Sequence, residues 1–560
     1  MKITCPVQLK DHQKPVVKQI WNRLTHDKEF SYIDTSDTGL GKTHVTLCLA
    51  WYLQKRYGLK VGIIAPSYQS LHSEDGWLSW VDKYGIDIEF TLRYSSIISH
   101  KGNISHPWLI RKLESKKKYN YISTSFFDKV ASEGLFLIFD EFHKATRKSS
   151  THFACAALVK ACKKYSDRCR VGLISHTPGD KEEHYPQILR MLGIVTEYRM
   201  FYLKPFTSQY EWEDYSLGQL IRFCSKKNPF VAFDEYTEKL SGVKVNNICK
   251  ELYHEYLKQY VTFSMKQPKT SIKTTMLNCF LETKPQDLEM INRGIGYLQR
   301  GVGWNGYDVD GGQWNMGSIT IGLKYIERGK LNSMINYVKK SLKENTRKKF
   351  VLCIGARDLQ HQYYVQKQLK RKYMTDEMYI TLRLMRKHNR YWKGLCKDMF
   401  NYILNFVYED LDPIKPDVMN GKTKNIDRSG IIANFQKSSN DSWCLIISPG
   451  VGAESISLHD KHGDYPREIL ITPDHFHTRV VQSAGRVNRV GVKSDSKIMI
   501  IYSKQGDVET SVLNCMVKKS TIAKNLLGNK EVMFPADYPA YIEGEKDKDL
   551  VKKLASLNIK

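Results

Sequence analysis

Residues 30–43 read Phe-Ser-Tyr-Ile-Asp-Thr-Ser-Asp-Thr-Gly-Leu-Gly-Lys-Thr, a short apolar run that leads into a loop with two glycines and ends on Lys-Thr. The run from Phe30 to Thr35 predicts a buried strand, and the segment from His44 to Tyr57 predicts a helix. Glycines allow backbone N–H groups to close around an oxyanion, and the following helix directs its positive N-terminal end at the same charge. Strand, loop and helix therefore predict a phosphate-binding loop within an α/β domain.

The loop follows the phosphate-binding pattern G-x-x-x-x-G-K-[ST], except that Ser36 stands in place of the first glycine. In this pattern Lys42 contacts the β and γ phosphates of a nucleoside triphosphate, and the Thr43 hydroxyl is a ligand of Mg²⁺. The sequence thus predicts ATP and Mg²⁺ as cofactors. The loop residues expected around the phosphates are Asp37, Thr38, Gly39, Leu40 and Gly41, followed by Lys42 and Thr43.

An acidic motif, Asp140-Glu-Phe-His143, ends a second apolar strand about a hundred residues further along the chain. Asp140 is predicted to hold Mg²⁺ through its water shell, together with Thr43, and Glu141 to orient and deprotonate an attacking water. His143 is predicted to couple this cleft to the next motif. The two motifs together predict hydrolysis of the triphosphate as well as its binding.

The composition sets outer limits on the class of protein. The chain has 560 residues, 41% of them apolar, which is enough for two or three domains with cores of their own. It has no apolar run of about 18 residues, so we expect no contact with a membrane. Its 12 cysteines form no C-x-x-C pair and its N-terminus lacks a hydrophobic signal region, so we expect an intracellular location.

The charge of the chain favours a polyanionic partner. The 86 lysines and arginines exceed the 59 acidic residues, which leaves a net charge of +27. Nucleic acid is the most common partner of such an excess, although solubility alone explains part of it. His152, Cys155, Cys162 and Cys169 have a spacing that could form a metal site, but one buried helix face of small residues is the more common interpretation.

Further apolar runs bounded by polar turns predict a parallel sheet in each half of the chain. In the first half they lie at 61–65, 121–124, 135–139 and 171–175, and in the second at 350–355, 445–448, 468–472 and 498–502. Two doubly wound α/β domains are the simplest interpretation. We expect them at 1–205 and 326–535, with a helical and glycine-rich insertion at 206–325, a basic insertion at 360–418 and a polar tail at 536–560.

These motifs together resemble the DExH helicases and translocases of superfamily 2, and in detail the Snf2-like translocases of double-stranded DNA. Leu173-Ile-Ser-His-Thr-Pro178 resembles the Leu-Thr-Gly-Thr-Pro motif of Snf2-like proteins. The resemblance implies two tandem RecA-like domains. It also implies that Gln13, in Leu9-Lys-Asp-His-Gln13, reads the adenine edge, for which an amide that both donates and accepts is suited.

The same resemblance implies contacts with the backbone of nucleic acid at the ends of two predicted strands. Pro66 and Ser67 follow the first of these strands, and Ser123 and Thr124 follow the second. Small hydroxyl side chains at strand ends can donate to phosphate oxygens, but they are equally common as helix caps. Both interpretations remain open from the sequence.

The resemblance extends to the second predicted domain through Gln482-Ser-Ala-Gly-Arg-Val-Asn-Arg-Val-Gly491. Arginines at i and i+3 share one face of a helix, so Arg486 and Arg489 can point together into a cleft. The resemblance implies that they accept charge from the γ phosphate, with Gln482 beside them. ATP hydrolysis would then depend on closure of the second domain over the first.

Two further segments of the second domain carry predicted contacts. Ser448-Pro-Gly-Val-Gly-Ala-Glu454 resembles the motif that joins nucleic acid to the ATP cleft, which implies that Ser448 contacts nucleic acid and that Gly452 and Glu454 contact the cleft. A basic stretch at 383–393 mixes cations with aromatic residues, so Arg386 and Arg390 are candidates for phosphate contact. A solvated helix face is the competing interpretation of that stretch.

The leading functional hypothesis is a DNA-dependent ATPase that translocates on duplex DNA or unwinds it, with little sequence preference. Protein partners in replication, transcription or repair would fit such an enzyme. An RNA helicase of the DExH type is the second hypothesis, because phosphate contacts do not distinguish the sugars. A non-enzymatic scaffold with a helicase-like body is the third, although such a scaffold would not need the full hydrolytic set. The lysine, asparagine and isoleucine usage would suit a large DNA virus or a phage.

Overall fold

In the computed structural model the chain forms two compact units; the first includes residues 1–270, and the second begins at residue 271. Each unit is built on its own sheet. The structure describes residues 5–98, 107–115, 118–203, 210–227, 240–265, 272–281, 283–303, 316–344, 347–354, 417–419, 423–439, 441–448, 456–473, 477–489, 491–503 and 540–542.

The sheet of the first unit has six strands in the order β10-β1-β7-β6-β2-β3. All neighbouring strands in it are parallel. Parallel strands are joined by crossovers, so helices cover both faces of the sheet and the strands are apolar along their length. The strands are β1 (Ser31–Asp34), β2 (Lys60–Ala65), β3 (Ile88–Arg93), β6 (Leu135–Asp140), β7 (Arg170–Ile174) and β10 (Thr262–Phe263).

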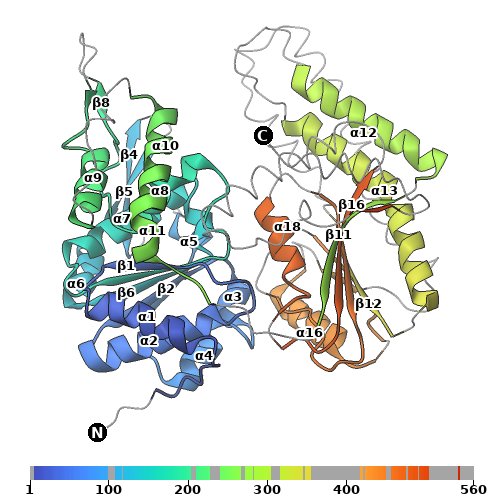
Figure 1. Cartoon of the computed structure of the whole chain (residues 1–560), viewed down its shortest axis with the longest axis horizontal. Coiled ribbons are helices and arrows are strands. Elements are labelled where there is room, and N and C mark those ends of the chain that lie inside the picture. Colours follow the sequence, from blue (N-terminus) through green and yellow to red (C-terminus); the bar gives the residue numbers. More distant parts are fainter. Residues whose placement is uncertain are drawn as a thin grey trace. The chain divides into compact units, whose positions relative to one another are not determined.

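Helices α1, α2 and α4 lie on one side of this sheet, and α7, α8 and α10 lie on the other (Figure 1). The core between the layers includes Leu137 and Phe139 of β6, which have no exposed surface. The helices are α1 (Lys14–Thr25), α2 (Lys42–Tyr57), α3 (Tyr68–His72), α4 (Trp77–Tyr84), α5 (Tyr94–Ile97), α6 (Ser125–Glu133), η1 (Phe142–Ala145), α7 (Ser150–Lys164), η2 (Glu182–His184), α8 (Tyr185–Met191), α9 (Ser216–Lys227), α10 (Gly242–Leu252), η4 (Tyr253–Leu257) and α11 (Lys258–Val261).

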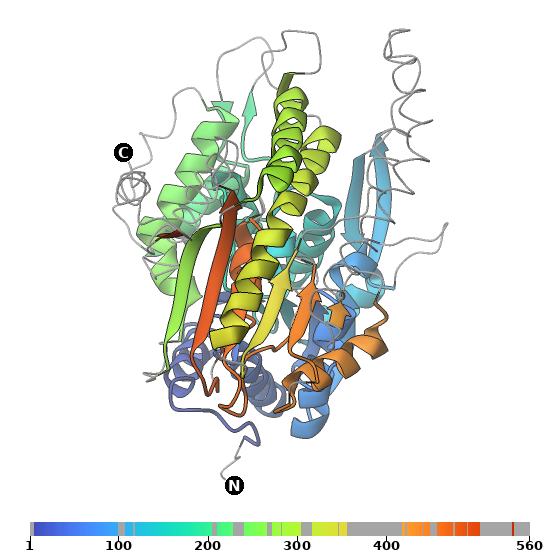
Figure 2. The ribbon, with the colours of Figure 1, turned by 90° about the vertical axis from the view of Figure 1, so that its right-hand side faces the viewer.

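The sheet of the second unit has seven strands in the order β13-β14-β12-β15-β16-β11-β17. They are all parallel, as the arrows in Figure 2 show for the central strands. The strands are β11 (Thr274–Leu281), β12 (Lys349–Cys353), β13 (Asp417–Met419), β14 (Cys444–Ile447), β15 (Arg467–Ile471), β16 (Ser496–Ser503) and β17 (Ala540–Ile542).

Two separate apolar layers cover the faces of the second sheet. Helix α13 (Met316–Glu344) packs Leu331 and Ile335 against one face, and α12 (Pro285–Gly303) packs against α13 (Figure 1). Helices α16 (Asn425–Gln436) and α18 (His477–Ala484) cover the other face, where Phe435 and Val480 are buried. This is the layered arrangement of a doubly wound domain.

The predicted fold class is confirmed, because both units are α/β domains of the RecA-like kind with parallel sheets. The prediction for 121–124 is wrong, since these residues do not enter the parallel sheet. They belong to an antiparallel hairpin of β4 (Leu109–Ser115) and β5 (Lys118–Ser123). Only one face of this hairpin is covered: Tyr121 is buried, while Ile122 is 39% exposed.

The stretch at 206–325, expected to be an insertion, contributes strands to both sheets. It supplies β10 at the edge of the first sheet and β11 to the second. A smaller hairpin of β8 (Tyr202–Leu203) and β9 (Tyr210–Glu211) also belongs to the first unit. Among the helices that the structure describes, none combines the length and apolarity needed to cross a membrane.

Candidate functional site

The predicted motifs of the first unit meet at one edge of its sheet. Asp34 pairs in register with Ile174, and Ile174 pairs with Asp140. The carboxyl ends of β1, β7 and β6 therefore lie side by side at the same level. Ligands of open α/β sheets bind outside this edge. The phosphate loop, the acidic motif and the segment after β7 thus converge where a ligand is expected.

The phosphate loop has the backbone conformation that its glycines permit. Gly39 and Gly41 have φ angles of 85° and 87°, in the left-handed region that other residues rarely adopt. A side chain at Gly41 would also collide with Gln13, because an added Cβ would lie 2.2 Å from its Nε2. Lys42 begins α2, and its Nζ donates to the carbonyl oxygens of Ser36 at 2.7 Å and Asp37 at 3.1 Å. The loop is thus closed around the ammonium group that the pattern assigns to phosphate.

Ser36, the departure from the pattern, has a defined structural role. It is fully buried, and its hydroxyl donates to Asp34 Oδ1 while accepting the backbone N–H of Met265 at 2.8 Å. The neighbouring Thr35 donates both its N–H and its hydroxyl to the carbonyl of Phe263, at 2.9 and 3.0 Å. The start of the phosphate loop is therefore fastened to β10 and the residues that follow it.

Gln13 lies against the phosphate loop, at the N-terminal end of α1, and is 3% exposed. Its Nε2 donates to the carbonyl of Leu40 at 2.9 Å, and its Oε1 accepts the N–H of Lys10 at 2.9 Å. His12 Nε2 lies 3.1 Å from the same Leu40 carbonyl. The segment that carries Gln13 is thus bound to the loop, and recognition of adenine by Gln13 remains a prediction.

Asp140 is the last residue of β6 and is held from two sides. Trp77 Nε1 donates to its Oδ2 at 3.0 Å, and the Tyr94 hydroxyl donates to its backbone carbonyl at 2.9 Å. Burial, followed by the neighbouring Glu141 charge, raises the pKa of Asp140 to about 7, while Trp77 and Lys42 oppose the shift. A cation placed at this carboxylate would relieve both causes.

Glu141 belongs to a network that joins the acidic motif to the segment after β7. Its Oε2 accepts the Ser175 hydroxyl at 3.3 Å and lies 3.2 Å from His143 Nδ1. His143 Nδ1 is itself 3.0 Å from the Ser175 hydroxyl. Glu141 has a φ of 51°, a costly conformation for a residue other than glycine and one that often marks a functional site. His176 extends the network, with Nδ1 3.4 Å from Asp37 of the phosphate loop.

The residues at this edge fit Mg²⁺ by their chemistry. Asp140 offers a carboxylate, and Thr43, in the first turn of α2, offers a hydroxyl. Mg²⁺ prefers such hard oxygen ligands, and at nucleotide sites it takes only one or two carboxylates because phosphates and waters complete its shell. The described residues contain no cluster of three His, Cys, Asp or Glu side chains that could hold a metal ion, and a nucleotide-bound Mg²⁺ does not need one.

The residues predicted to contact nucleic acid in the first unit follow strands. Pro66 and Ser67 directly follow β2, and Ser67 caps α3 by accepting the N–H of Ser70. Ser123 ends β5, and Thr124 caps α6 by accepting the N–H of Phe127. The capping roles are therefore real. Caps lie at helix N-termini, where anions also bind, so the capping role and the predicted contact are compatible.

In the second unit, the prediction that Arg486 and Arg489 share one face of a helix is wrong. Helix α18 ends at Ala484, so Arg486 and Arg489 lie in the turn beyond it and share no helix face. Arg486 is 2% exposed, and its side chain donates to the Ile456 carbonyl at 3.4 Å. Arg489 donates to the Ser457 hydroxyl at 2.7 Å. Both arginines thus fasten the segment at 456–458, and their predicted part in catalysis stays a prediction.

Gln482 is buried within α18, and Ser448 is half-buried directly after β14. Four predicted residues lie outside the described part of the chain: Gly452 and Glu454 of the cleft motif, and Arg386 and Arg390 of the basic stretch. Their predicted roles are neither supported nor opposed by the geometry.

Sequence reasoning missed Trp77 and the segment after α11. A tryptophan in an ordinary amphipathic helix has no spacing that would connect it to an aspartate 63 residues away. Phe263 and Met265 bond to the phosphate loop through backbone groups, so no pattern of side chains in the sequence indicates these contacts.

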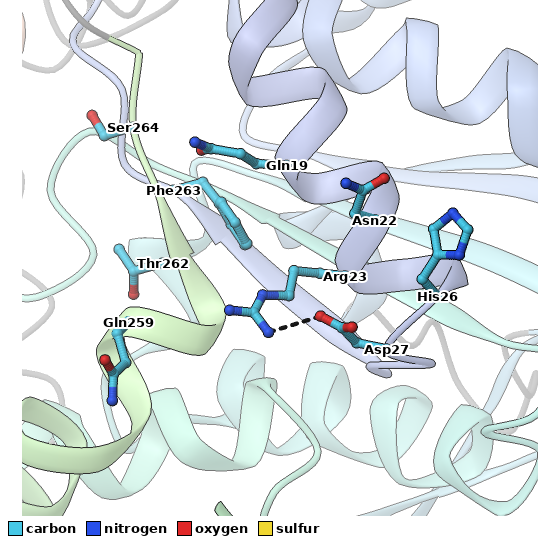
Figure 3. Close-up of a pocket in the computed structure, with 9 residues that line it drawn as sticks. All are labelled: Gln19, Asn22, Arg23, His26, Asp27, Gln259, Thr262, Phe263 and Ser264. Carbon is cyan, nitrogen blue, oxygen red and sulfur yellow. Dashed lines mark hydrogen bonds and ion pairs between the residues drawn. The ribbon is translucent and has the colours of Figure 1, made fainter.

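An open pocket of about 670 Å³ lies between α1 and β10. Figure 3 shows Arg23 of α1 joined by an ion pair to Asp27, which follows that helix, at the wall of the pocket, with Phe263 facing them. The other lining residues are Gln19, Asn22, His26, Gln259, Thr262 and Ser264.

Comparison with known proteins gives one family match. Residues 6–178 match the family model ResIII, described as "Type III restriction enzyme, res subunit", a domain of helicase superfamily 2. This range contains the phosphate loop, the acidic motif and the segment after β7. It supports the superfamily 2 part of the predicted resemblance and, with it, a helicase-type ATPase domain. No curated protein matches the chain.

Solved structures to which the chain is similar include S. cerevisiae Dbp5 bound to RNA and ADP BeF3, with 9% identity over 98% of each chain and a TM-score of 0.40. They also include the Sulfolobus solfataricus SWI2/SNF2 ATPase core in complex with dsDNA, with 13% identity over 93% of each chain and a TM-score of 0.28.

Proposed function

We propose that this chain is a nucleic-acid-dependent ATPase of helicase superfamily 2 that acts on DNA, as a helicase or as a translocase on the duplex. One observation carries the proposal. The phosphate loop, Asp140, Glu141 and Ser175 meet at the carboxyl edge of one parallel sheet, inside the range that matches the superfamily 2 model.

The proposed chemistry assigns a role to each residue of this edge. Lys42 exchanges the carbonyls of Ser36 and Asp37 for the β and γ phosphates of ATP, which are stronger acceptors for an ammonium. Thr43 and Asp140 hold Mg²⁺, which neutralises charge on the phosphates when bound. Glu141 orients the attacking water and accepts its proton.

The network around Glu141 has a further role in the proposal. The Ser175 hydroxyl lies between Glu141 and His143, so a shift of the segment after β7 would reorient the general base. Through His176 and Asp37 the same segment also reaches the phosphate loop. Arg486 and Arg489 are proposed to complete the site from the second unit, as arginines of this kind typically raise phosphoryl-transfer rates by about 10³ to 10⁵.

DNA is favoured over RNA because Leu173-Ile-Ser-His-Thr-Pro178 resembles the Snf2-like motif. An RNA helicase is the second candidate, since contacts to phosphate oxygens do not distinguish the two nucleic acids. The net charge of +27 suits either.

The test is steady-state ATP hydrolysis with duplex DNA, single-stranded DNA and RNA as separate activators. We expect duplex DNA to stimulate the wild-type chain most. Glu141→Gln should lower kcat by roughly 10² or more while nucleotide binding persists, because only the proton acceptor is lost. Glu133→Gln is the matched control, since Glu133 is an exposed residue of the same unit, paired with Lys60.

The outcomes separate the hypotheses. Stimulation by RNA alone would overturn the DNA assignment and leave the RNA helicase. Full activity in Glu141→Gln would remove Glu141 as the general base. Absence of hydrolysis with every activator would favour a scaffold. A strand-displacement assay then distinguishes unwinding from translocation without strand separation.

A further inference from the structure

Trp77 contacts the acidic motif from a part of the chain that the proposed chemistry does not use. It is the first residue of α4 and is 2% exposed, so its indole is removed from solvent. Its Nε1 donates to Oδ2 of Asp140 at 3.0 Å. A buried indole N–H normally finds an acceptor, and here the acceptor is the carboxylate assigned to Mg²⁺.

The backbone around Trp77 fixes the position of the indole. Gly76 precedes it in the turn between α3 and α4, where an added Cβ would lie 2.8 Å from the Leu71 carbonyl and from Ser73. The turn is therefore closely packed, and α3 and α4 are in direct contact. The indole thus approaches Asp140 from a rigid support.

Two side chains donate to Asp140, and they act on different atoms. Tyr94 donates to the backbone carbonyl, which orients the end of β6. Trp77 donates to one carboxylate oxygen, Oδ2, which fixes the rotation of the carboxylate. Groups that orient a metal ligand in this way typically change metal affinity by roughly 10- to 100-fold when they are removed.

We propose that Trp77 is a positioning residue for Mg²⁺-nucleotide binding: its indole N–H holds the Asp140 carboxylate, through Oδ2, in the orientation that the Mg²⁺ site would require. The inference rests on the proposed function, because it requires that Asp140 serve Mg²⁺. It adds a residue outside the phosphate loop and the acidic motif to the parts that determine the metal dependence of the enzyme.

The test measures binding of a fluorescent ATP analogue, mant-ATP, to the full chain during titration with MgCl₂ and, separately, in EDTA. Trp77→Phe keeps an aromatic ring but removes the N–H. We expect the MgCl₂ concentration for half-maximal enhancement of binding to rise about tenfold. Binding in EDTA should stay at the wild-type level, because the phosphate loop is intact.

Three variants make the test specific. Trp80→Phe removes an indole from the same helix, one that packs on Tyr84 and His44, and should leave the Mg²⁺ dependence unchanged. Tyr94→Phe removes the bond to the backbone and should have a smaller effect than Trp77→Phe. Trp77→His keeps a ring N–H at the corresponding position of a five-membered ring, so it should recover part of the Mg²⁺ dependence if the N–H is what matters.

Two results would overturn the inference. One is wild-type Mg²⁺ dependence in Trp77→Phe. The other is an equal loss of mant-ATP binding with and without Mg²⁺, which would indicate a purely structural role. If Trp77→Phe fails to fold, Trp77→His decides in its place: recovery of part or all of the wild-type Mg²⁺ dependence supports the inference, and an equal loss with and without Mg²⁺ opposes it. Absence of mant-ATP binding by the wild-type chain would instead contradict the proposed function.

Discussion

At the scale of single residues, Ser36 stands where the general phosphate-loop pattern has glycine, and its hydroxyl has two partners. It donates to Asp34 and accepts the N–H of Met265. We predict that Ser36→Ala lowers the free energy of unfolding of the first unit by about 1 to 3 kcal/mol, because the Met265 N–H loses its acceptor and Asp34 Oδ1 loses a donor while keeping the backbone N–H of residue 36. Urea unfolding followed by circular dichroism measures the change.

Ser132→Ala is the control for Ser36→Ala, because Ser132 is a half-buried residue of the same unit whose hydroxyl donates to the Lys129 carbonyl within its own helix. Its effect should be within about 0.5 kcal/mol of zero. Equal stability of Ser36→Ala and the wild type would show that the two bonds of the hydroxyl make no net contribution.

The burial of His152 makes the stability of the first unit depend on pH. It is fully buried, and its Nδ1 donates to the Ala145 carbonyl at 2.7 Å. Burial, followed by the charge of Arg190, lowers its pKa from 6.5 to about 4. The unfolded chain therefore takes up the proton first, and this contribution to stability is present above about pH 6.5 and is lost as the pH falls toward 4.

Between about pH 7.5 and pH 5, His152 alone should remove about 2 kcal/mol from the free energy of unfolding. We predict that the free energy of unfolding of His152→Gln falls by about 2 kcal/mol less than that of the wild type between the two pH values, as measured by urea unfolding. His184 and His254, whose pKa values are also lowered to about 4, keep part of the acid sensitivity in the variant. The same loss in both proteins would contradict the assignment.

Where a local pattern exists, the sequence predicted the position of individual residues in the fold. Lys42 begins the helix after the phosphate loop, and Asp140 and Glu141 lie at the end of their strand, where their motifs place them. Trp77 and Met265 could not be predicted, because their contacts depend on which segments the fold brings together across 63 and 229 residues.

At the scale of elements, Lys349 of β12 donates hydrogen bonds to the C-terminal end of a helix in the second unit, α16. It is the first residue of β12 and fully buried, and its Nζ donates to the carbonyls of Phe435 at 2.9 Å and Lys437 at 2.7 Å. These carbonyls belong to the C-terminal end of α16, where a cation is favourable. Burial lowers the pKa of Lys349 to about 8.

We predict that Lys349→Met destabilises the second unit by about 1 to 3 kcal/mol, because the carbonyls at the end of α16 lose a donor that water cannot replace. Lys461→Met, at an exposed position of the same unit, is the control and should be near neutral. Thermal unfolding of both variants measures the difference. A more stable Lys349→Met would mean that the cost of burying the ammonium exceeds the value of its bonds.

How well a strand could be predicted depends on how clearly its sequence shows that it is buried. Strands buried on both faces, such as β6, have unbroken apolar sequences and were predicted close to their bounds. The residues of β5 were assigned to the wrong sheet because a four-residue apolar segment does not show whether its partner is parallel or antiparallel. The strand β10 has two residues, too few for any periodicity.

At the scale of the whole molecule, the sequence predicted two α/β domains because each half repeats the pattern of apolar strands. The division within 206–325 was not predictable, since β11 reads Thr-Thr-Met-Leu-Asn-Cys-Phe-Leu, which lacks the strict alternation that would identify a strand and reads equally well as part of a helical stretch. Charge, in contrast, is a property of the whole chain that composition gives directly.

The net charge of +27 leads to the last prediction. Cations that neutralise phosphates release counterions, so the affinity for duplex DNA should fall steeply with salt. With about four phosphates neutralised, the slope of log K against log salt should be about −3.6, which is a loss of roughly a hundredfold between about 50 and 200 mM. Fluorescence anisotropy of labelled duplex DNA measures this slope.

Two variants separate the kinds of contact behind that slope. Arg390→Ala should reduce its magnitude by about one, because a cation is lost from the predicted basic stretch. Ser67→Ala should weaken binding without changing the slope, because a hydroxyl donates to phosphate but releases no counterion. An unchanged slope in Arg390→Ala would remove this residue from the DNA-binding surface, and a salt-independent affinity of the wild-type chain would contradict binding through the phosphate backbone.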